Sequence, residues 1–464
     1  MKEIFYKYSN RSDLIAIKTE FESLSYKQVF EHSQKISNNL SSIIQSNQKY
    51  IPILSSNCKE FIIITIALWN LGLVPVPLNI KWTEKEIKDL ITDNSFEIIF
   101  YEKILEDLVK SLEIKKISFN DLFGLNYKLS FKRSNDESVV IFTSGSSAKP
   151  KGVIHSFASL VNSIFNCSDI LKQNIGDRWL ASLPFYHIGG FQIICRALSN
   201  GCELILPIDN QINSLKNSIY KFKPTHISLV AAQLNNLLNE KIKPDKSLKV
   251  CLIGGGFSED NLLLKAQEEG WNPIRVYGST ETASLITAAE VKEIIKRPNT
   301  VGRPVKNVKL KVSNENEILI STNSLFKNYL NNETEFRQKV QNGFYYSGDL
   351  GTIDEDEYLF IEAKRTDLIV SGGENINPYE VENALLKIPS IKEACVFPIQ
   401  DVYWGQIVAA LLVLDGNIDE EHIKNELKKE LSSYKIPKKF FQTDKLPRTS
   451  LGKIEREKVK KMFN

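Results

Sequence analysis

The chain has 464 residues, more than one compact core usually holds, and this length predicts two or three domains. Its 59 Lys and Arg residues nearly balance 56 Asp and Glu residues, so the net charge of +3 gives no reason to expect a nucleic acid or an anionic membrane as partner. No apolar run approaches the roughly 20 residues that span a bilayer, and the N-terminus lacks a signal-peptide core. We therefore expect a cytoplasmic protein without a membrane span, whose six scattered cysteines are free thiols.

The first third of the chain alternates helical and strand-like patterns. A helix is expected to begin after Ser25, and a second helix is expected over residues 61–71. Short apolar strands are expected at 50–54 and 74–78, and the run 83–86 has the spacing of a helix capping box. This alternation predicts a parallel sheet with helices on both faces.

Strand-like runs continue through the middle of the chain, where parallel and antiparallel patterns follow one another. Short apolar strands, typical of a parallel sheet, are expected at 139–142, 204–206, 226–230, 249–253 and 274–276. Residues 309–312 and 317–321 flank a polar turn and read as an antiparallel pair.

The pattern changes near residues 363–368, beyond which the chain has α+β character. Helices are expected near 378–387 and 419–431, and strands near 394–399 and 407–414. We predict an N-terminal domain of residues 1–366 and a C-terminal domain of residues 367–464. The predicted fold class is α/β: a large N-terminal domain of parallel-type α/β subdomains plus a small antiparallel or barrel part, followed by a small mobile α+β domain.

A loop rich in Ser, Gly and Lys follows the expected strand at 139–142 and spans Thr143 to Gly152. Hydroxyls and backbone N–H groups can donate to phosphate oxygens, Gly permits close approach, and Lys supplies positive charge. The loop is not a Walker A motif, because Lys151 is followed by Gly152 rather than Ser or Thr. Taken alone, this run could equally be a surface turn.

The run Thr143–Gly152 resembles the nucleotide-binding signature of the adenylate-forming superfamily, which contains acyl- and aryl-CoA synthetases, peptide-synthetase adenylation domains and luciferases. Ala148 stands where that signature usually has Gly. The resemblance implies an ATP-dependent enzyme with Mg²⁺ as cofactor. It implies that this loop binds ATP through Thr143, Ser144, Gly145, Ser146, Ser147 and Lys151.

Two further motifs follow in the family's order. The glycine-rich turn Gly254, Gly255 and Gly256 would lie against the adenine, although alone it would read as a plain turn. In the run 277–282 the resemblance implies that Tyr277 stacks on the adenine, Thr280 contacts phosphate in catalysis, and Glu281 binds Mg²⁺. An aromatic face suits a purine, and a hard cation that bridges phosphates needs a carboxylate. Gly278 and Ser279 complete this nucleotide segment, and Gly278 would also contact the acid.

The last motifs of the family lie near and beyond the expected domain boundary. Asp349 would accept both ribose hydroxyls, because an ionised carboxylate has two acceptor oxygens. Arg365 would lie near the ribose and phosphate, and Asp367 would be the hinge, although Lys364 replaces a usual Gly. The C-terminal run 447–453 resembles the signature whose lysine, here Lys453, stabilises charge at the α-phosphorus during adenylation.

The resemblance implies two half-reactions, in which an acid first forms an acyl-AMP and the acyl group then passes to coenzyme A. The small domain would swing about Asp367, withdraw Lys453 and present Ser371, Gly372, Gly373 and Glu374 to coenzyme A. Glycines suit a narrow passage for pantetheine, because a side chain would block it.

Residues 183–191 resemble the segment that lines the acyl pocket in this family. The resemblance implies that His187 gates the pocket or orients the carboxylate of the acid. This stretch lacks the Asp with which peptide synthetases hold an α-amino group, which favours a CoA ligase. It resembles, together with residues 371–382, the 2-succinylbenzoate–CoA ligases of menaquinone synthesis. Arg196 is a candidate for holding the second carboxylate of such an acid; an arginine at such a position is more often an ordinary helix-surface residue.

Other assignments remain open at this stage. A medium-chain or aryl acyl-CoA synthetase is the alternative within the class. A stand-alone adenylation domain, a non-catalytic homologue and a luciferase-like oxygenase are alternatives outside it. The expected partners are a small carboxylic acid, ATP and coenzyme A, and the chain can be expected to form a homodimer.

Overall fold

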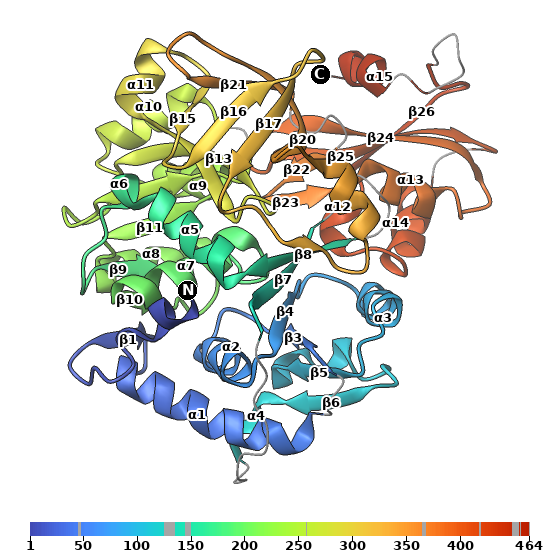
Figure 1. Cartoon of the computed structure of the whole chain (residues 1–464). Helices are drawn as coiled ribbons and strands as arrows, with labels where there is room; N and C mark the ends of the chain where they lie inside the picture. Colours follow the sequence, from blue (N-terminus) through green and yellow to red (C-terminus); the bar gives the residue numbers. More distant parts are fainter. Residues whose placement is uncertain are drawn as a thin grey trace.

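The protein is described by a computed structural model that covers residues 1–44, 48–124, 135–143, 150–256, 258–363, 368–416, 419–447, 454 and 456–463. In Figure 1 the first segment of the chain, in blue and cyan, lies below the green and yellow middle segment. The orange-to-red C-terminal segment lies beside both. The mixed α/β architecture agrees with the predicted fold class.

The first segment contains a parallel sheet in the order β4-β3-β5-β6. Its elements are, in chain order, η1 (Lys2–Tyr6), β1 (Ile15–Lys18), β2 (Ser23–Ser25), α1 (Tyr26–Ile43), β3 (Tyr50–Leu54), α2 (Lys59–Leu71), β4 (Val74–Leu78), α3 (Glu84–Asp93), β5 (Ile98–Tyr101), η2 (Lys103–Leu108), β6 (Lys115–Ser118) and α4 (Phe119–Gly124). The predicted strands at 50–54 and 74–78 and the helix after Ser25 are confirmed, and capping boxes close the N-termini of α1 and α3.

The middle segment carries a long sheet whose order is β16-β17-β20-β21-β15-β14-β13-β12-β11-β9-β10-β1-β2. Its elements are, in chain order, β7 (Glu137–Thr143), β8 (Lys151–Ser156), α5 (Phe157–Asn166), α6 (Ser168–Leu171), β9 (Arg178–Leu180), α7 (Ile188–Asn200), β10 (Glu203–Ile205), α8 (Ile212–Phe222), β11 (His226–Leu229), α9 (Ala231–Asn239), β12 (Val250–Ile253), α10 (Asp260–Glu268), β13 (Pro273–Ser279), β14 (Ser284–Glu290), α11 (Val291–Lys296), β15 (Thr300–Pro304), β16 (Val308–Val312), β17 (Glu317–Thr322), β18 (Asn328–Tyr329), α12 (Glu333–Lys339), β19 (Val340–Gln341), β20 (Phe344–Ile353) and β21 (Leu359–Ala363).

The long sheet changes from parallel to antiparallel pairing at β13. Strands from β1 through β10, β9, β11 and β12 to β13 pair in parallel, whereas β13, β14 and β15 pair antiparallel. The predicted antiparallel pair at 309–312 and 317–321 is confirmed as β16 and β17. The short sheet β18-β8-β7 is separate and antiparallel.

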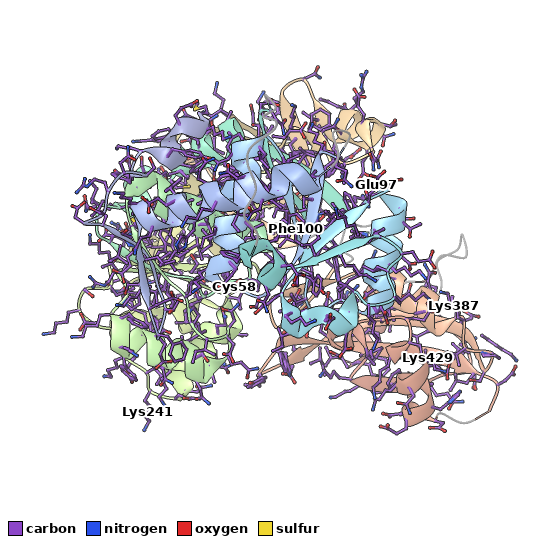
Figure 2. All side chains as sticks on the ribbon, turned by 90° about the horizontal axis from the view of Figure 1, so that it is seen from below. Cys58, Glu97, Phe100, Lys241, Lys387 and Lys429 are labelled. Atoms are coloured by element: carbon purple, nitrogen blue, oxygen red, sulfur yellow. The ribbon has the colours of Figure 1, made fainter. Side chains whose placement is uncertain are left out.

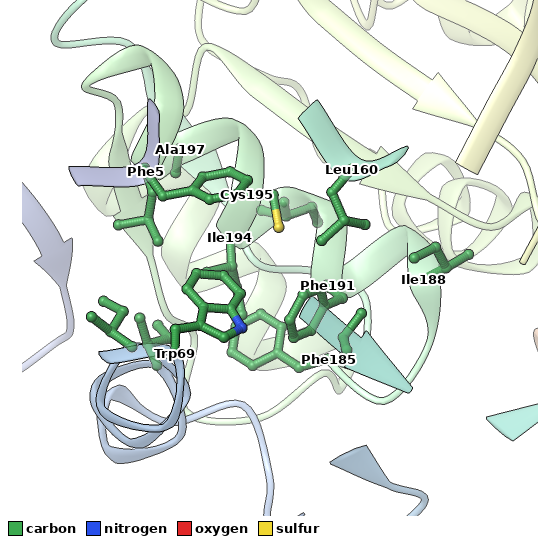
Figure 3. Packing of buried hydrophobic residues seen from close by; sticks show 14 of the residues in the cluster. Phe5, Trp69, Leu160, Phe185, Ile188, Phe191, Ile194, Cys195 and Ala197 are labelled. Carbon is green, nitrogen blue, oxygen red and sulfur yellow. The ribbon is translucent and has the colours of Figure 1, made fainter. Parts of the chain in front are cut away.

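The prediction of one parallel sheet for the first third of the chain is incomplete. β1 and β2 do not join β3–β6 but extend the long sheet, where Ile17 pairs with Leu204. The reason is long-range packing, which Figure 3 shows: Phe5 and Trp69 meet Phe191 of α7 in one buried cluster. Phe5 and Trp69 stack with ring centroids 5.3 Å apart. This packing fixes α7, and with it the loop that carries His187.

The C-terminal unit, defined here as the described residues from 368 onward, has its own five-stranded sheet. Its elements are β22 (Ile369–Ser371), β23 (Glu374–Ile376), α13 (Pro378–Leu385), β24 (Ile391–Asp401), β25 (Gly405–Leu414), α14 (Glu420–Lys428), η3 (Ser433–Lys435), β26 (Lys439–Gln442) and α15 (Arg456–Phe463). Figure 2, seen from below, shows this unit with Lys387 and Lys429 as a lobe beside the sheet that carries Phe100. The predicted α+β character is confirmed, while the boundary at 366/367 lies outside the described residues.

The six cysteines are free, as predicted. Burial raises the pKa of thiols such as Cys195 and Cys251, which keeps them protonated. Within the described parts of the chain, no helix combines the length and apolar character that crossing a membrane requires.

Candidate active site

Tyr277 and Asp349, which are 72 residues apart in sequence, meet across the long sheet. The Tyr277 hydroxyl lies at the end of β13 and donates to Asp349 Oδ2 of β20 at 2.6 Å. Both residues are buried. A carboxylate next to an aromatic ring is the pairing that a nucleoside requires, because the ring offers a face to a base and the carboxylate accepts hydroxyl donors.

The turn after β13 holds Thr280 and Glu281 in fixed positions. The Tyr329 hydroxyl donates to Glu281 Oε1 at 3.1 Å, and Glu281 is only 3% exposed. Burial lowers the pKa of His155 to about 4, so its imidazole is neutral near pH 7. His155 Nε2 therefore donates to the Thr280 carbonyl oxygen at 2.8 Å. Sequence reasoning missed both His155 and Tyr329; the only signal was a polar His within an apolar strand.

Gly278 is required by a close approach of two strands. A Cβ atom at this position would lie 2.0 Å from the Ser284 carbonyl oxygen of β14, so any side chain would push the hairpin apart. The neighbouring Ser279 backbone N–H donates to Thr282 Oγ1 at 3.0 Å. The glycine thus has a packing reason besides any contact with a ligand.

The predicted phosphate loop connects β7 to β8 and begins next to the pair formed by Thr143 and Lys151. Ser144, Gly145, Ser146 and Ser147 lie outside the described residues. The Lys151 ammonium forms an ion pair with Glu335 of α12. In this arrangement it is therefore engaged with a protein carboxylate.

Glu374 of the C-terminal unit reaches into the N-terminal part and meets two cationic or ionisable side chains there. Its Oε1 lies 2.8 Å from Lys81 Nζ, and its Oε2 lies 3.4 Å from Nε2 of His187, which stands just before α7. Burial by itself raises the pKa of Glu374, but His187 and Lys81 lower it to about 2. Glu374 is therefore ionised at neutral pH.

The turn that presents Glu374 is made of two glycines with positive φ, Gly372 at 55° and Gly373 at 84°. A Cβ on Gly373 would contact Val230 at 3.3 Å, so this turn lies directly against the N-terminal part. The third glycine of the turn after β12, Gly256, likewise faces Val370. The hairpin β22–β23, with Ser371 at its tip, is thereby inserted beside the glycines 254–256.

A pocket between the two parts is lined by four of the predicted site residues. Its lining includes Thr143, His187, Thr280, Glu374, Tyr434 and Lys435. Tyr434 and Lys435 were not predicted, and no local pattern marks them. Among the described residues no group of three or more side chains of the metal-ligating types comes together.

Three predicted residues, Arg365, Asp367 and Lys453, lie outside the described residues. Leu446 and Ile454, on either side of the segment that holds Lys453, pack with Cys395 and Phe397 of β24. Glu380, which lines the pocket, belongs to α13, and that helix packs on the opposite face of the same sheet.

Arg196 is buried on α7, at 1% exposure, so the alternative of a helix-surface arginine is wrong. Its Nη2 donates to Ser284 Oγ at 3.3 Å, and its guanidinium lies 5.5 Å from the Trp179 ring centroid. Burial lowers the pKa of Arg196, and its Nε has no hydrogen-bond partner within the described residues. A buried guanidinium that has no carboxylate partner among the described residues is stabilised when an anion binds to it.

The arrangement of the two parts matches one solved complex better than another. An o-succinylbenzoate CoA synthetase from Bacillus subtilis, a double mutant bound with its product analogue OSB-NCoA, superposes with a TM-score of 0.93 at 27% identity, covering 99% of this chain and 98% of that one. The same synthetase in complex with ATP and magnesium ion gives 0.74 at 28% identity, covering 98% of each.

Family models and curated relatives agree with this match. The model described as AMP-binding enzyme matches residues 5–330, and the model described as AMP-binding enzyme C-terminal domain matches residues 380–453. A curated relative from Bacillus subtilis (strain 168), 2-succinylbenzoate–CoA ligase, is 30% identical over 96% of this chain and 94% of its own length. With these matches and the geometry above, the chain belongs to the AMP-binding enzyme family.

Proposed function

We propose that the chain is a 2-succinylbenzoate–CoA ligase that forms an acyl-AMP and then the CoA thioester, with release of pyrophosphate and AMP. The full-length relatives and the product-analogue complex support this activity. The choice of this acid rests on the guanidinium of Arg196, which is buried and whose Nε has no hydrogen-bond partner among the described residues. 2-Succinylbenzoate has two carboxylates, of which only one reacts, and the other can pair with this cation.

In the first half-reaction the N-terminal part binds ATP. The residues assigned to the nucleotide and its phosphates are Thr143, Ser144, Gly145, Ser146, Ser147, Lys151, Gly254, Gly255, Gly256, Tyr277, Gly278, Ser279, Thr280, Asp349 and Arg365. Tyr277 offers its ring to the adenine, and Asp349 accepts from the ribose hydroxyls. The pairing of these two side chains supports that assignment.

Glu281 is the residue assigned to Mg²⁺, and its fixed carboxylate fits a cation that takes its remaining ligands from phosphates and water. Bound there, Mg²⁺ would neutralise charge on the phosphates. The acid's carboxylate oxygen attacks the α-phosphorus, and the bond to pyrophosphate breaks. Lys453 is assigned to stabilise the charge that develops at this phosphorus.

In the second half-reaction the CoA sulfur attacks the acyl carbonyl, the thiol proton leaves, and the bond from the carbonyl to AMP breaks. The turn Ser371–Glu374 is assigned to admit the pantetheine arm beside His187, which orients the reacting carboxyl group. The approach of Glu374 to His187 supports the assignment, because it brings this turn to the residue proposed to orient the acid. Rotation of that part about Asp367 connects the two half-reactions.

The test is a substrate panel with detection of the acyl-CoA product by mass. The purified chain is supplied with ATP, Mg²⁺ and CoA, and with 2-succinylbenzoate, benzoates or medium-chain fatty acids. We expect preferential conversion of 2-succinylbenzoate. Conversion of benzoates or fatty acids alone would favour the alternative, an aryl or medium-chain acyl-CoA synthetase.

Arg196→Met tests the assignment of the second carboxylate. Loss of a charge-assisted pair is expected to raise the KM for 2-succinylbenzoate roughly 100-fold. Turnover of 4-oxo-4-phenylbutanoate, which lacks the ring carboxylate, should be unchanged. Arg303→Met, which removes an exposed arginine remote from α7, is the matched control. Equal losses with both acids would remove Arg196 from the substrate site.

Two further expectations concern the cellular location and the oligomeric state. A cytoplasmic location is proposed from the sequence alone, and so is a homodimer. Light scattering coupled to size-exclusion chromatography measures the oligomeric state, and a monomer at micromolar concentration would exclude the homodimer.

A further inference from the structure

A buried lysine that lines the same pocket as Glu374 joins the two parts of the molecule. The Lys435 side chain, 4% exposed, lies at the end of η3 in the C-terminal unit. Its Nζ is 2.8 Å from Glu380 Oε1 in the same unit and 2.5 Å from Glu86 Oε1 of α3 in the N-terminal part. One cation therefore bridges a carboxylate of its own unit and a carboxylate of the other.

Glu86 is held in place by its own helix. Its Oε2 accepts from the Thr83 backbone N–H at 2.8 Å and from Thr83 Oγ1 at 3.0 Å, which closes the capping box of α3. The Ser432 hydroxyl of the C-terminal unit also donates to Glu86 Oε2. The carboxylate is thus fixed by two donors of the N-terminal part and receives two donors of the C-terminal unit.

These contacts depend differently on the orientation of the two parts. The pair Lys435–Glu380 lies within one unit and persists when that unit turns. The bonds from Lys435 and Ser432 to Glu86 cross between the parts and exist only when the unit is docked as here. Figure 1 shows α3 beside the C-terminal unit, below α14. The whole chain superposes better on the product-analogue complex of the Bacillus subtilis synthetase than on its complex with ATP and magnesium ion, with TM-scores of 0.93 and 0.74, so the present docking resembles that of the former.

A second ion pair across the same boundary differs in its exposure. Lys85, the neighbour of Glu86 on α3, pairs with Glu430, and the two side chains are 41% and 30% exposed. Exposed pairs contribute little, since water and salt screen them, whereas breaking a buried pair leaves an uncompensated charge. Lys435 should therefore matter to docking far more than Lys85.

We infer that Lys435 is a positioning residue for thioester formation, which locks the C-terminal unit onto the α3 capping box and is dispensable for adenylation. This inference rests on the proposed function for its two half-reactions. Lys435 need not touch the reacting atoms, because it acts by favouring the orientation in which the Ser371–Glu374 turn reaches the site.

The decisive experiment measures the half-reactions separately in the full chain. Acyl-AMP formation is followed by single-turnover pyrophosphate release without CoA. Thioester formation is followed by adding CoA to preformed enzyme-bound acyl-AMP. Lys435→Met should slow the second step roughly 10- to 100-fold and leave the first within about twofold. Glu86→Gln, which keeps an oxygen for the helix cap, should act in the same direction.

Lys435→Arg retains the charge and should retain most of the thioester rate. Lys85→Met removes the same charge from the same boundary and should leave both steps near wild type. A merely structural role would lower both half-reactions together, and that result, or an unchanged thioester step in Lys435→Met, would overturn the inference.

Solution X-ray scattering separates this inference from the proposed function. The ligand-free wild-type chain should fit the docked arrangement, and Lys435→Met should give a more open profile, whatever acid the enzyme accepts. If the wild type were inactive on 2-succinylbenzoate but this scattering difference were observed, the proposed substrate would be wrong, whereas the role of Lys435 in docking the C-terminal unit would stand. Identical scattering profiles for the two proteins would contradict the role of Lys435 in docking the C-terminal unit.

Discussion

Two regions of the molecule are held together by different kinds of contact. At the proposed nucleotide end, Tyr277 bonds to Asp349 and His155 bonds to the Thr280 backbone, all within the N-terminal part. At the boundary with the C-terminal unit, charged side chains such as Lys435 and Glu86 form the bonds. Contacts that both half-reactions use need never break, whereas ion pairs across a boundary can be exchanged for water when the unit turns.

The largest effect is expected from breaking the nucleotide end at Asp349. Asp349→Ala removes the acceptor proposed for two ribose hydroxyls and should lower kcat/KM for ATP roughly 100- to 1000-fold. Asp356→Ala, which removes an exposed carboxylate nearby in sequence, is the control. Steady-state kinetics with varied ATP measure the loss, and an unchanged kcat/KM would place the ribose elsewhere.

The buried His155 makes the nucleotide end sensitive to acid. Burial lowers the pKa of His155 to about 4, whereas the unfolded chain takes up the proton near its ordinary value of 6.5. The free energy of unfolding should therefore fall as pH drops from 6.5 to 4, by at most about 3 kcal/mol from this group. Urea titrations across this range measure the slope.

His155→Gln should reduce that pH slope, because the group that must stay neutral is gone. His422→Gln, at an exposed position of α14, is the control and should leave the slope as it is. A slope that His155→Gln does not alter would assign the acid sensitivity to other groups.

A smaller effect is expected at the boundary from Glu374→Gln, which removes the charge paired with Lys81 and close to His187. The thioester step should slow roughly 10-fold while acyl-AMP formation stays near wild type. Because the pKa of Glu374 is about 2, its carboxylate stays ionised from about pH 5 upward and should add no ionisation to the pH profile of that step. A loss in acyl-AMP formation instead would show that Glu374 serves both half-reactions.

The smallest effect is expected from Tyr277→Phe. This change removes one hydroxyl that donates to Asp349 and keeps the ring proposed to stack on adenine. The KM for ATP should rise by about fivefold, because one hydrogen bond among several contributes about 1 kcal/mol. A rise as large as that from Asp349→Ala would mean that the hydroxyl, rather than the ring, is the main contribution of Tyr277.

Much of the local structure could be predicted. The helix that begins after Ser25, the capping box at Thr83 and the strands at 50–54 and 74–78 agree with the structure, because short-range hydrogen bonding and apolar runs determine them. The placement of β1 and β2 could not be predicted, since it depends on a core built from Phe5, Trp69 and α7.

The candidate site divides in the same way. The runs 143–152 and 277–282 are assigned to phosphate, purine and metal binding through their resemblance to the family's motifs, and their residue types suit those ligands. The hydrogen bonds that hold these runs in place could not be predicted. His155 bonds to the Thr280 carbonyl oxygen and Tyr329 bonds to Glu281, and both partners lie on elements distant in sequence. A capping glutamate such as Glu86 also gives no local sign that it serves a second partner.

The sequence by itself determined the elements, the order of the motifs and the family, because these depend on residue types at short spacing. Only the tertiary structure decided that Arg196 is buried, that Tyr277 meets Asp349, and that Lys435 bridges two carboxylates of different parts. Burial and long-range charge pairing arise when distant segments pack together and exclude water, and no local pattern records which segments will meet.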